Sequence, residues 1–323
     1  MFTEEKKNSQ IFQDSNNIHK HVDEIETYNF KKEIYKKNIP TEIVGKNTKN
    51  CIGNKLQCAK VLDLSRLSGI VEYLPEELYI KVKACTPISL IEESLEKNNQ
   101  QLAFEPIDFG YLKDSKSNKG TAAGQLSCNF SGSRRFKVGS LRDHILGFRG
   151  VNGKGDIIKS GGTVVKNVTG YDLSKLVTGS FGTLTALTEI TFKVLPKKDS
   201  ISTLVIYLED NKIISDLFDQ LLSSSNEISG AVYIPVEPNN KNYTKNIEKI
   251  FKFNNLKSEE PFVAVRIEGS KKSIDERIQD ISQELQIKKM KTSMLDFYQS
   301  KLFWEKINNR SEEHTSELQS RAY

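Results

Sequence analysis

The sequence lacks the long apolar runs and the leader that mark membrane and secreted proteins. No apolar stretch approaches the roughly 20 residues that are needed to span a bilayer. Residues 1–10 carry charges with no apolar core behind them, a pattern that does not match a secretion signal. By default, these absences predict a cytoplasmic protein.

The cysteines lack the spacing of a metal site. Cys51, Cys58, Cys85 and Cys128 form no C-x-x-C pair and have no histidine partner at ligand spacing, and the four histidines do not cluster. We therefore predict reduced thiols and no bound metal. His144, the only histidine in the glycine-rich part of the chain, is interpreted as a hydrogen-bonded structural residue.

Clustered positive charge is also scarce. The formal net charge is +5, but lysine is spread over the whole chain. The only local basic cluster, at residues 133–137, is too short for a nucleic-acid-binding surface, and an anionic cofactor would explain it equally well. The P-loop pattern G-x-x-x-x-G-K-[ST] is absent as well. These features argue against a nucleic-acid-binding protein and against a P-loop.

What the sequence does have is a concentration of glycine. Thirteen of the 19 glycines lie between Gly120 and Pro196. Glycine permits positive φ angles and a close approach of the backbone to a ligand, at a cost in conformational entropy. Because strand and helix patterns persist in this segment, we expect its backbone to wrap around a ligand.

A small α/β unit is predicted before that segment. Residues 1–21 are polar and unpatterned, and a helix over residues 22–37 stops at Pro40. A β-branched strand then runs into a Gly/Lys/Asn/Thr loop at residues 45–50. The N–H groups of such a loop can form a phosphate-binding nest, and an ordinary polar turn is the alternative. Further patterns predict strands at 61–64, 70–73 and 79–84 and a helix at 87–95.

Small residues dominate the start of the glycine-rich segment, between Gly120 and Gly132. They suit a helix or turn that packs tightly against a ligand, and the N-terminus of a helix there would favour a pyrophosphate. An Asn-Gly turn after residue 151 predicts a hairpin with arms at residues 145–151 and 156–159.

The end of the same segment predicts a short helix and a long strand. Asp172 is expected to cap a helix whose apolar face carries Leu173, Leu176 and Val177. Period-two alternation then predicts a strand over residues 184–194. Its second face is expected to carry the polar side chains Thr185, Glu189, Thr191 and Lys193.

The chain changes character after residue 200, where glycine becomes scarce. Strand and helix patterns alternate in the order β-α-β-β-α-β, which is typical of a ferredoxin-like domain. These elements are expected at residues 204–208, 213–221, 231–234, 262–267, 274–285 and 287–290. Residues 310–321 have no apolar period and look like a translated sequencing adapter, so we expect the natural C-terminus to be missing.

Several motifs together resemble a known family. The runs F-E-P-I-D-F-G at residues 104–110, G-T-A-A-G at 120–124, S-G-S-R-R at 131–135 and L-R-D-H-I-L-G at 141–147 resemble the FAD-binding PCMH-type domain of the vanillyl-alcohol-oxidase-like flavoproteins. The run from residue 166 to residue 184 resembles more specifically the E-subunit family of bacterial glycolate oxidases, which are FAD-binding subunits.

The resemblance implies an α+β fold. It implies a two-subdomain PCMH-type FAD-binding domain over residues 22–200 and a smaller ferredoxin-like α+β cap domain, incomplete, over residues 201–309. A flexible N-terminal segment, residues 1–21, and a non-native tail, residues 310–323, would flank them.

The resemblance also implies a cofactor site for FAD. The loop that would cradle the pyrophosphate consists of Gly45, Lys46, Asn47, Thr48 and Lys49. The residues that would lie beside the diphosphate and the flavin, or in the second cofactor-contacting turn, are Pro106, Gly120, Thr121, Gly124, Ser131 and Gly132. The chain departs from the family at two places: Lys46 and Asn47 stand where glycines are common, and G-T-A-A-G replaces T-[IL]-G-G. No histidine occupies a position for covalent flavin attachment, so non-covalent FAD is expected.

The implied function is that of an FAD-dependent oxidoreductase subunit that acts on a 2-hydroxy acid such as glycolate and forms the 2-oxo acid. Its partners would be a D-type flavoprotein subunit and an iron–sulfur F-type subunit, with no membrane span of its own and membrane association only through the complex. The D-type subunit is the expected seat of oxidation, so no catalytic residue is nominated. Helix capping explains Asp172 and packing explains Tyr171.

Two alternatives stay open at this point. The altered glycines at Lys46 and Asn47 are compatible with a non-catalytic scaffolding subunit whose flavin is weak or lost. A stand-alone cell-wall-precursor UDP-sugar reductase of the same fold is the other alternative. The run K-N-V-T-G-Y-D at residues 166–172 argues against that enzyme, as does the lack of its catalytic signature.

Overall fold

The computed structural model describes residues 27–29, 32, 35–36, 39–49, 52, 57–108, 119–162, 170–235, 260–284 and 290–308. The predicted N-terminal segment 1–21, the first part of the K-N-V-T-G-Y-D run and the tail 310–323 lie outside the described residues. The described positions between 27 and 36 are helical, in agreement with the helix expected over residues 22–37.

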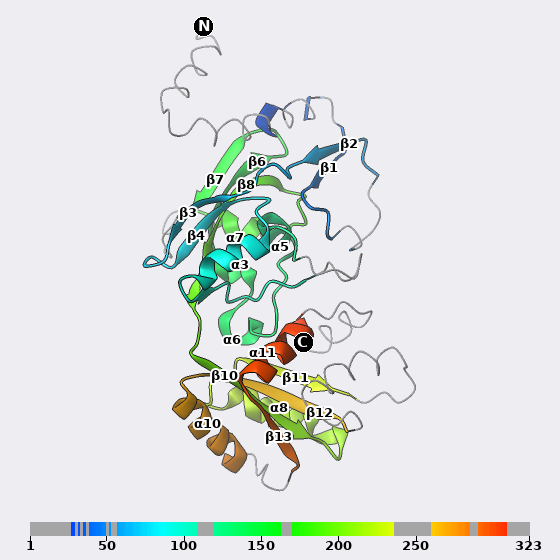
Figure 1. The fold of residues 1–323 in the computed structure, drawn as a ribbon. Coiled ribbons are helices and arrows are strands. Elements are labelled where there is room, and N and C mark those ends of the chain that lie inside the picture. The colour runs from blue at the N-terminus through cyan, green and yellow to red at the C-terminus, as the bar shows by residue number, and fades with distance from the viewer. Residues whose placement is uncertain are drawn as a thin grey trace. The chain divides into compact units, whose positions relative to one another are not determined.

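The chain forms two compact units, each made of more than one stretch of sequence (Figure 1). The first unit comprises Met1–Asn98, Asn118–Phe130 and Leu141–Val194. The second comprises Asn99–Ser117, Ser131–Ser140 and Leu195–Tyr323. The domain boundaries that the sequence suggests, 22–200 and 201–309, stay a prediction.

A five-stranded antiparallel sheet is the framework of the first unit. Its strand order is β3-β4-β8-β6-β7, and the strands are β3 (Ile70–Leu74), β4 (Tyr79–Lys83), β8 (Thr185–Lys193), β6 (Ile145–Asn152) and β7 (Ile157–Gly161). The β6–β7 hairpin closes as expected through a turn in which the Gly155 N–H donates to the Asn152 carbonyl at 3.0 Å. Gly155 has φ +86°, a value that favours glycine.

The central strand β8 differs from its expected half-exposed form. Thr185 and Thr191, assigned to a polar face, are buried, as are Ala186 and Ile190 on the other face. The strand has a neighbour on either side, and its threonines are small enough to pack where solvent was expected. Leu184 lies before the strand and is exposed. The apolar face therefore begins at Ala186, two residues later.

Beyond the helical positions between residues 27 and 36, the described part of the first unit also contains three helices and a two-stranded sheet. The helices α3 (Ile88–Glu96), α5 (Ala122–Cys128) and α7 (Leu173–Val177) gather beside the sheet, with the 3₁₀ turn η1 (Leu141–His144), in which His144 is buried. Pro87 is the N-cap of α3 and not part of its first turn. The strands β1 (Thr41–Val44) and β2 (Lys60–Asp63) pair in parallel, and a small core joins them to the main sheet through Leu62, Leu64, Leu67, Cys85 and Ala186.

Helix α7 is capped as predicted, but its apolar face is narrower. The Asp172 carboxylate accepts a hydrogen bond from the Lys175 N–H at 3.3 Å. Val177 is buried, whereas the Leu176 side chain is 60% exposed and does not belong to the core. A five-residue helix turns too few side chains toward the sheet to bury all three expected positions.

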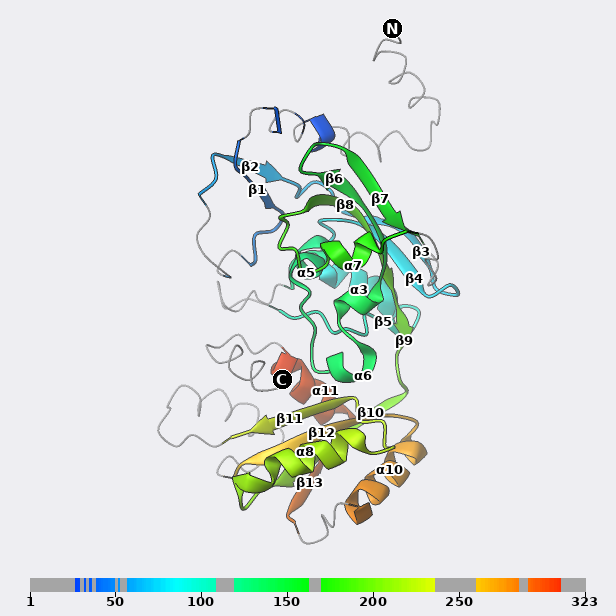
Figure 2. The same cartoon turned by 180° about the vertical axis from the view of Figure 1, so that it is seen from behind.

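The second unit has the predicted ferredoxin-like topology (Figure 2). Its elements are β10 (Ser200–Tyr207), α8 (Ile214–Ser223), β11 (Gly230–Ile234), β12 (Phe262–Gly269), α10 (Lys271–Glu284) and β13 (Thr292–Leu295). The antiparallel order β11-β12-β10-β13 places the first and third strands in the centre. Residues 287–289 of the last expected strand, 287–290, lie outside the described residues, and the last described strand is β13. Shorter elements are β5 (Gln100–Gln101), β9 (Leu195–Pro196), α6 (Arg135–Val138) and η2 (Asn211–Ile213).

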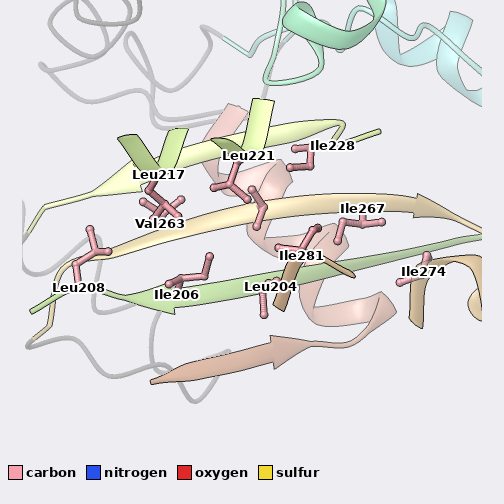
Figure 3. Packing of buried hydrophobic residues seen from close by; sticks show 11 residues of the cluster. Leu204, Ile206, Leu208, Leu217, Leu221, Ile228, Val263, Ile267, Ile274 and Ile281 are labelled. Carbon is pink, nitrogen blue, oxygen red and sulfur yellow. The ribbon is translucent and has the colours of Figure 1, made fainter. Parts of the chain in front are cut away.

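Both faces of this sheet are covered. On one face, side chains from α8 and α10 interlock with β10 and β12, and Figure 3 shows this cluster, which includes Leu204, Leu217, Leu221, Val263 and Ile281. On the other face lies α11 (Phe297–Asn308), a helix that the sequence patterns did not predict. It packs Phe303 and Trp304 against Val205 and Phe262. Residues 262–267 are therefore buried on both sides, as central strands are.

Candidate cofactor-binding site

The loop at residues 45–49 begins where β1 ends, in the first unit. Val44 is the last residue that pairs with β2, and its carbonyl accepts from the Leu64 N–H at 2.9 Å. Asn47 has φ +53°, which is the left-handed region. Asparagine is one of the few non-glycine residues that tolerate this region. The departure from the family's glycine at this position therefore leaves the loop in a conformation that glycine would also adopt.

In this loop, the backbone N–H groups of Gly45, Lys46, Asn47 and Thr48 have no acceptor among the described residues. Successive N–H groups around a left-handed residue form a concave nest that binds anions. This geometry suits an anion such as a phosphate, and the contact of the loop with the cofactor's pyrophosphate stays a prediction.

Gly120 and Gly124 pack directly against this loop. A Cβ atom added to Gly120 would lie 2.7 Å from Thr48 Oγ1 and 3.0 Å from Lys49 Nζ, and Gly120 has φ +76°. A Cβ added to Gly124 would lie 3.5 Å from Lys49 Nζ. These two glycines therefore leave the space that the ends of the Thr48 and Lys49 side chains occupy.

Gly45 packs closely against the side chains of Cys85 and Thr121. A Cβ added to it would lie 3.0 Å from Cys85 Sγ and 3.6 Å from Thr121 Oγ1. The structure consequently brings together all five loop residues with three further predicted site residues: Gly120, Thr121 and Gly124.

The N-terminus of α5 does not offer the free N–H groups that the sequence suggested. The Ala122 N–H donates to the Thr86 carbonyl at 3.0 Å, and the Ala123 N–H donates to the Ala84 carbonyl at 2.8 Å. The Thr121 side chain caps the helix by accepting from the Gly124 N–H at 3.2 Å. The first three amides of α5 are therefore used inside the protein, and its role here is to carry the glycines.

Two thiols flank the cluster, and both are held protonated. Burial, with the nearby Asp63 carboxylate, raises the pKa of Cys85 to about 12, and the charge of Lys46 opposes this only in part. Burial also raises the pKa of Cys128, against the charge of Lys49. Neither thiol is a nucleophile at neutral pH. Among the described residues, no group of three His, Cys, Asp or Glu side chains is placed to hold a metal ion.

The other three predicted site residues belong to the second unit. Pro106 and Ser131 are buried there. A Cβ added to Gly132 would lie 2.7 Å from Glu105 Cβ and 2.9 Å from Asn308 Cγ, so close packing alone requires glycine at this position. The contact of these three residues with a cofactor stays a prediction.

The same part of the second unit holds a buried charge network that sequence patterns did not reveal. Arg266 donates to both Glu105 oxygens, at 2.7 and 3.1 Å, and stacks 4.7 Å from the centre of the Trp304 ring. Arg134 donates its backbone N–H to Glu105 at 2.7 Å and binds Glu268 through two side-chain nitrogens. Each carboxylate thus meets an arginine.

The arginines of these pairs keep the pKa values of both buried carboxyl groups below the usual value. Burial alone would raise the pKa of Glu105, but the Arg266 and Arg134 charges outweigh it and hold the pKa below its usual value. Burial would likewise raise the pKa of Glu268, and the hydrogen bond and charge of Arg134 lower it. Both carboxylates are therefore ionised at neutral pH.

Tyr171 was expected to be a packing residue, and this is wrong. Its side chain is 91% exposed, because it precedes the cap of α7 on the surface of the first unit. Asp172 does have the capping role that the sequence suggested.

Comparison with known proteins gives the class of residues 23–161, which belong partly to the first unit and partly to the second. Residues 23–161 match the family model described as "FAD binding domain". Over these residues the chain is similar to an FAD-binding domain of the PCMH type, and FAD is its cofactor. The contact of the loop and the glycines with FAD stays a prediction. The model spans the loop 45–49 and Gly120, Thr121 and Gly124.

Particular relatives are glycolate oxidase subunits. The chain is 42% identical over 158 residues to glycolate oxidase subunit GlcE of Escherichia coli K12, which covers 49% of this chain and 43% of that protein. It is 39% identical over 109 residues to glycolate oxidase subunit GlcD of Bacillus subtilis 168, covering 33% of this chain and 23% of that protein. The matches thus span less than half the length of these relatives.

Solved structures show the same fold at low sequence identity. An alkyldihydroxyacetonephosphate synthase matches with a TM-score of 0.64 at 19% identity, over 87% of this chain and 52% of that chain. At this identity the match defines the fold alone. Within the described residues, no helix is long and apolar enough to cross a membrane.

Proposed function

We propose that the chain is the FAD-binding subunit of a glycolate-oxidase-like complex. The observation that carries the proposal is the loop at residues 45–49. The N–H groups of residues 45–48 donate no hydrogen bond to the described residues, and the Lys49 ammonium lies beside Gly120. The 42% identity to glycolate oxidase subunit GlcE supports the choice of complex. The reaction is the oxidation of a 2-hydroxy acid, glycolate in the first instance, to the 2-oxo acid.

When bound, FAD supplies the two-electron acceptor for this oxidation. The residues of this chain would bind and orient it: the loop N–H groups would hold the diphosphate, and the two glycines make room for the Thr48 and Lys49 side chains beside it. The cofactor is held without a covalent bond. Electrons leave to an iron–sulfur subunit, and a D-type flavoprotein subunit completes the complex in the cytoplasm. The similarity to glycolate oxidase subunit GlcD supports this partner.

The first experiment asks whether the full chain binds FAD. The purified protein is expected to be yellow, with a flavin absorbance band, and acid precipitation is expected to leave all of the flavin in the supernatant. Gly120→Val is the matched variant, because its side chain would collide with Thr48 and Lys49. A colourless wild-type chain that gains no flavin on incubation with FAD would overturn the proposal.

The second experiment tests the activity of the complex. The chain is co-expressed with a D-type and an iron–sulfur subunit, and glycolate-dependent reduction of a dye is measured for complexes that contain wild-type chain or Gly120→Val. The proposal expects the flavin-deficient variant to lose most of the rate while it still assembles. An unchanged rate with that variant would instead assign the chain a scaffolding role.

A further inference from the structure

We propose that Lys49 is the residue through which this site selects the cofactor's diphosphate, in the place that a helix N-terminus would otherwise fill. The proposal rests on the FAD binding proposed above. It assigns to one side chain a task that the sequence pattern spread over the whole loop.

The first observation is the position of the Lys49 ammonium. It lies where a Cβ of Gly120 would come within 3.0 Å and a Cβ of Gly124 within 3.5 Å, and it donates to Thr48 Oγ1 at 3.5 Å. The ammonium therefore lies beside Gly120 and the first turn of α5, next to the Thr48 hydroxyl. The absence of side chains at Gly120 and Gly124 is what gives it this place.

The second observation is that α5 cannot do this work with its own amides. Its first N–H groups donate to Thr86, Ala84 and Thr121, as described above. Helix N-termini attract phosphate mainly through such amides, when these are free. Because these amides of α5 already donate hydrogen bonds within the protein, Lys49 supplies the positive charge beside the N-terminus of α5.

The third observation is the contrast between the two lysines of the loop. Lys49 is half-buried, whereas Lys46 is exposed. An exposed charge is screened by salt and water, while one that is partly buried beside its ligand acts at short range. Lys154, an exposed lysine in the β6–β7 turn and outside the loop, supplies a control with the same formal charge.

Two consequences follow for binding. Because Lys49 recognises the diphosphate, its loss should weaken the binding of FAD and leave the weak binding of riboflavin, which has no phosphate, unchanged. Loss of one charge-assisted contact corresponds to an affinity lower by about 10- to 100-fold. The part of the salt dependence of FAD binding that is due to this contact should disappear as well.

The experiment is a titration of the cofactor-free full chain with FAD and with riboflavin, followed by flavin fluorescence at low and high salt. It compares wild type with Lys49→Met, Lys49→Arg and Lys154→Met. We expect Lys49→Met alone to lose FAD affinity and salt dependence, Lys49→Arg to retain most of both, and riboflavin binding to be equal in all four proteins.

Three results would overturn the inference. Equal losses for Lys154→Met and Lys49→Met would mean that the charge acts diffusely. A parallel loss of riboflavin binding would mean that Lys49 is only structural. Full FAD affinity in Lys49→Met would mean that the loop amides suffice, and in that case the proposed function stands while this inference fails. If wild type itself bound no FAD, both would fall together.

Discussion

The Arg266 guanidinium donates to both carboxylate oxygens of Glu105, although 161 positions separate the two residues. Arg266 is 1% exposed, and Glu105 adopts φ +53° to present its carboxylate. This pair ties the stretch Asn99–Ser117 to strand β12 within the second unit. Two predictions about the stability of the second unit depend on this pair.

Arg266→Met should destabilise the second unit strongly. Removal of one partner leaves the Glu105 charge buried, a defect that costs about 3–5 kcal/mol. Trp304, the only tryptophan of the chain, lies against Arg266, so its fluorescence in a urea titration reports this unit. Arg135→Met is the control because the Arg135 side chain is exposed. A loss below about 1 kcal/mol for Arg266→Met would contradict the buried pair.

The same network should make the second unit sensitive to acid. The pKa values of Glu105 and Glu268 are lower in the folded chain than the usual value of about 4.3. The stabilisation is therefore fully present above that value and is lost as the pH falls through it toward the folded-state pKa values. Trp304-monitored urea titrations from about pH 6 to about pH 3 should show this loss. Glu105→Gln, less stable at neutral pH, should show a flatter dependence, and an equally steep one would refute the assignment.

Gly120→Ala should impair FAD binding. The new methyl group would overlap Thr48 Oγ1 and Lys49 Nζ, and alanine at φ +76° costs about 1–2 kcal/mol. A cofactor titration should show an affinity lower by at least about tenfold, since Lys49 must move. Gly153→Ala is the control, because nothing lies within 4 Å of a Cβ at that turn position. Equal affinities for the two variants would show that the loop and Gly120 are not in contact.

Asn47 should be replaceable by glycine but not by valine. Glycine adopts φ +53° without strain, whereas a β-branched residue there is a steric outlier. We expect Asn47→Gly to retain FAD affinity and Asn47→Val to lose it while the far-UV circular dichroism of both stays native. If Asn47→Val bound FAD as tightly as wild type, the nest would not depend on the left-handed residue.

The thiols should differ sharply in reactivity. Cys58 is exposed, whereas Cys85 is buried with a pKa of about 12. Iodoacetamide at neutral pH should therefore alkylate Cys58 in the native chain and reach Cys85 only after unfolding, as peptide mass spectrometry would show. If iodoacetamide alkylated Cys85 rapidly in the folded protein, the Cys85 sulfur would not be buried beneath the backbone of Gly45.

Much of the local structure could be predicted because it depends on near neighbours in the sequence. Strand-to-loop transition after Val44, the Asp172 cap and the β-α-β-β-α-β alternation are all set by short-range patterns. The order of the sheet followed from that alternation, since a ferredoxin-like unit has only one common arrangement.

What could not be predicted depends on distant partners. The amides of α5 are closed by carbonyls of residues 84 and 86, which no pattern near Ala122 reveals. Arg266 and Glu268 stand two positions apart on one face of β12, yet nothing in that strand names Glu105 or Arg134 as their partners. Burial of Thr185 and Thr191 likewise reflects the strands beside β8, and not β8 itself.

The division of the second unit into three stretches of sequence has a consequence for synthesis. Glu105 and Arg134 leave the ribosome more than a hundred residues before Arg266 and Glu268 complete their ion pairs. Until then, the charges of Glu105 and Arg134 have no ion-pair partner in the nascent chain. Because an unpaired charge is costly to bury, these charges keep their segments in contact with water. A chain whose synthesis stops before β12 would therefore contain the whole sequence of the first unit. The early stretches of the second unit would be present without their partners, and proteases and chaperones could reach them.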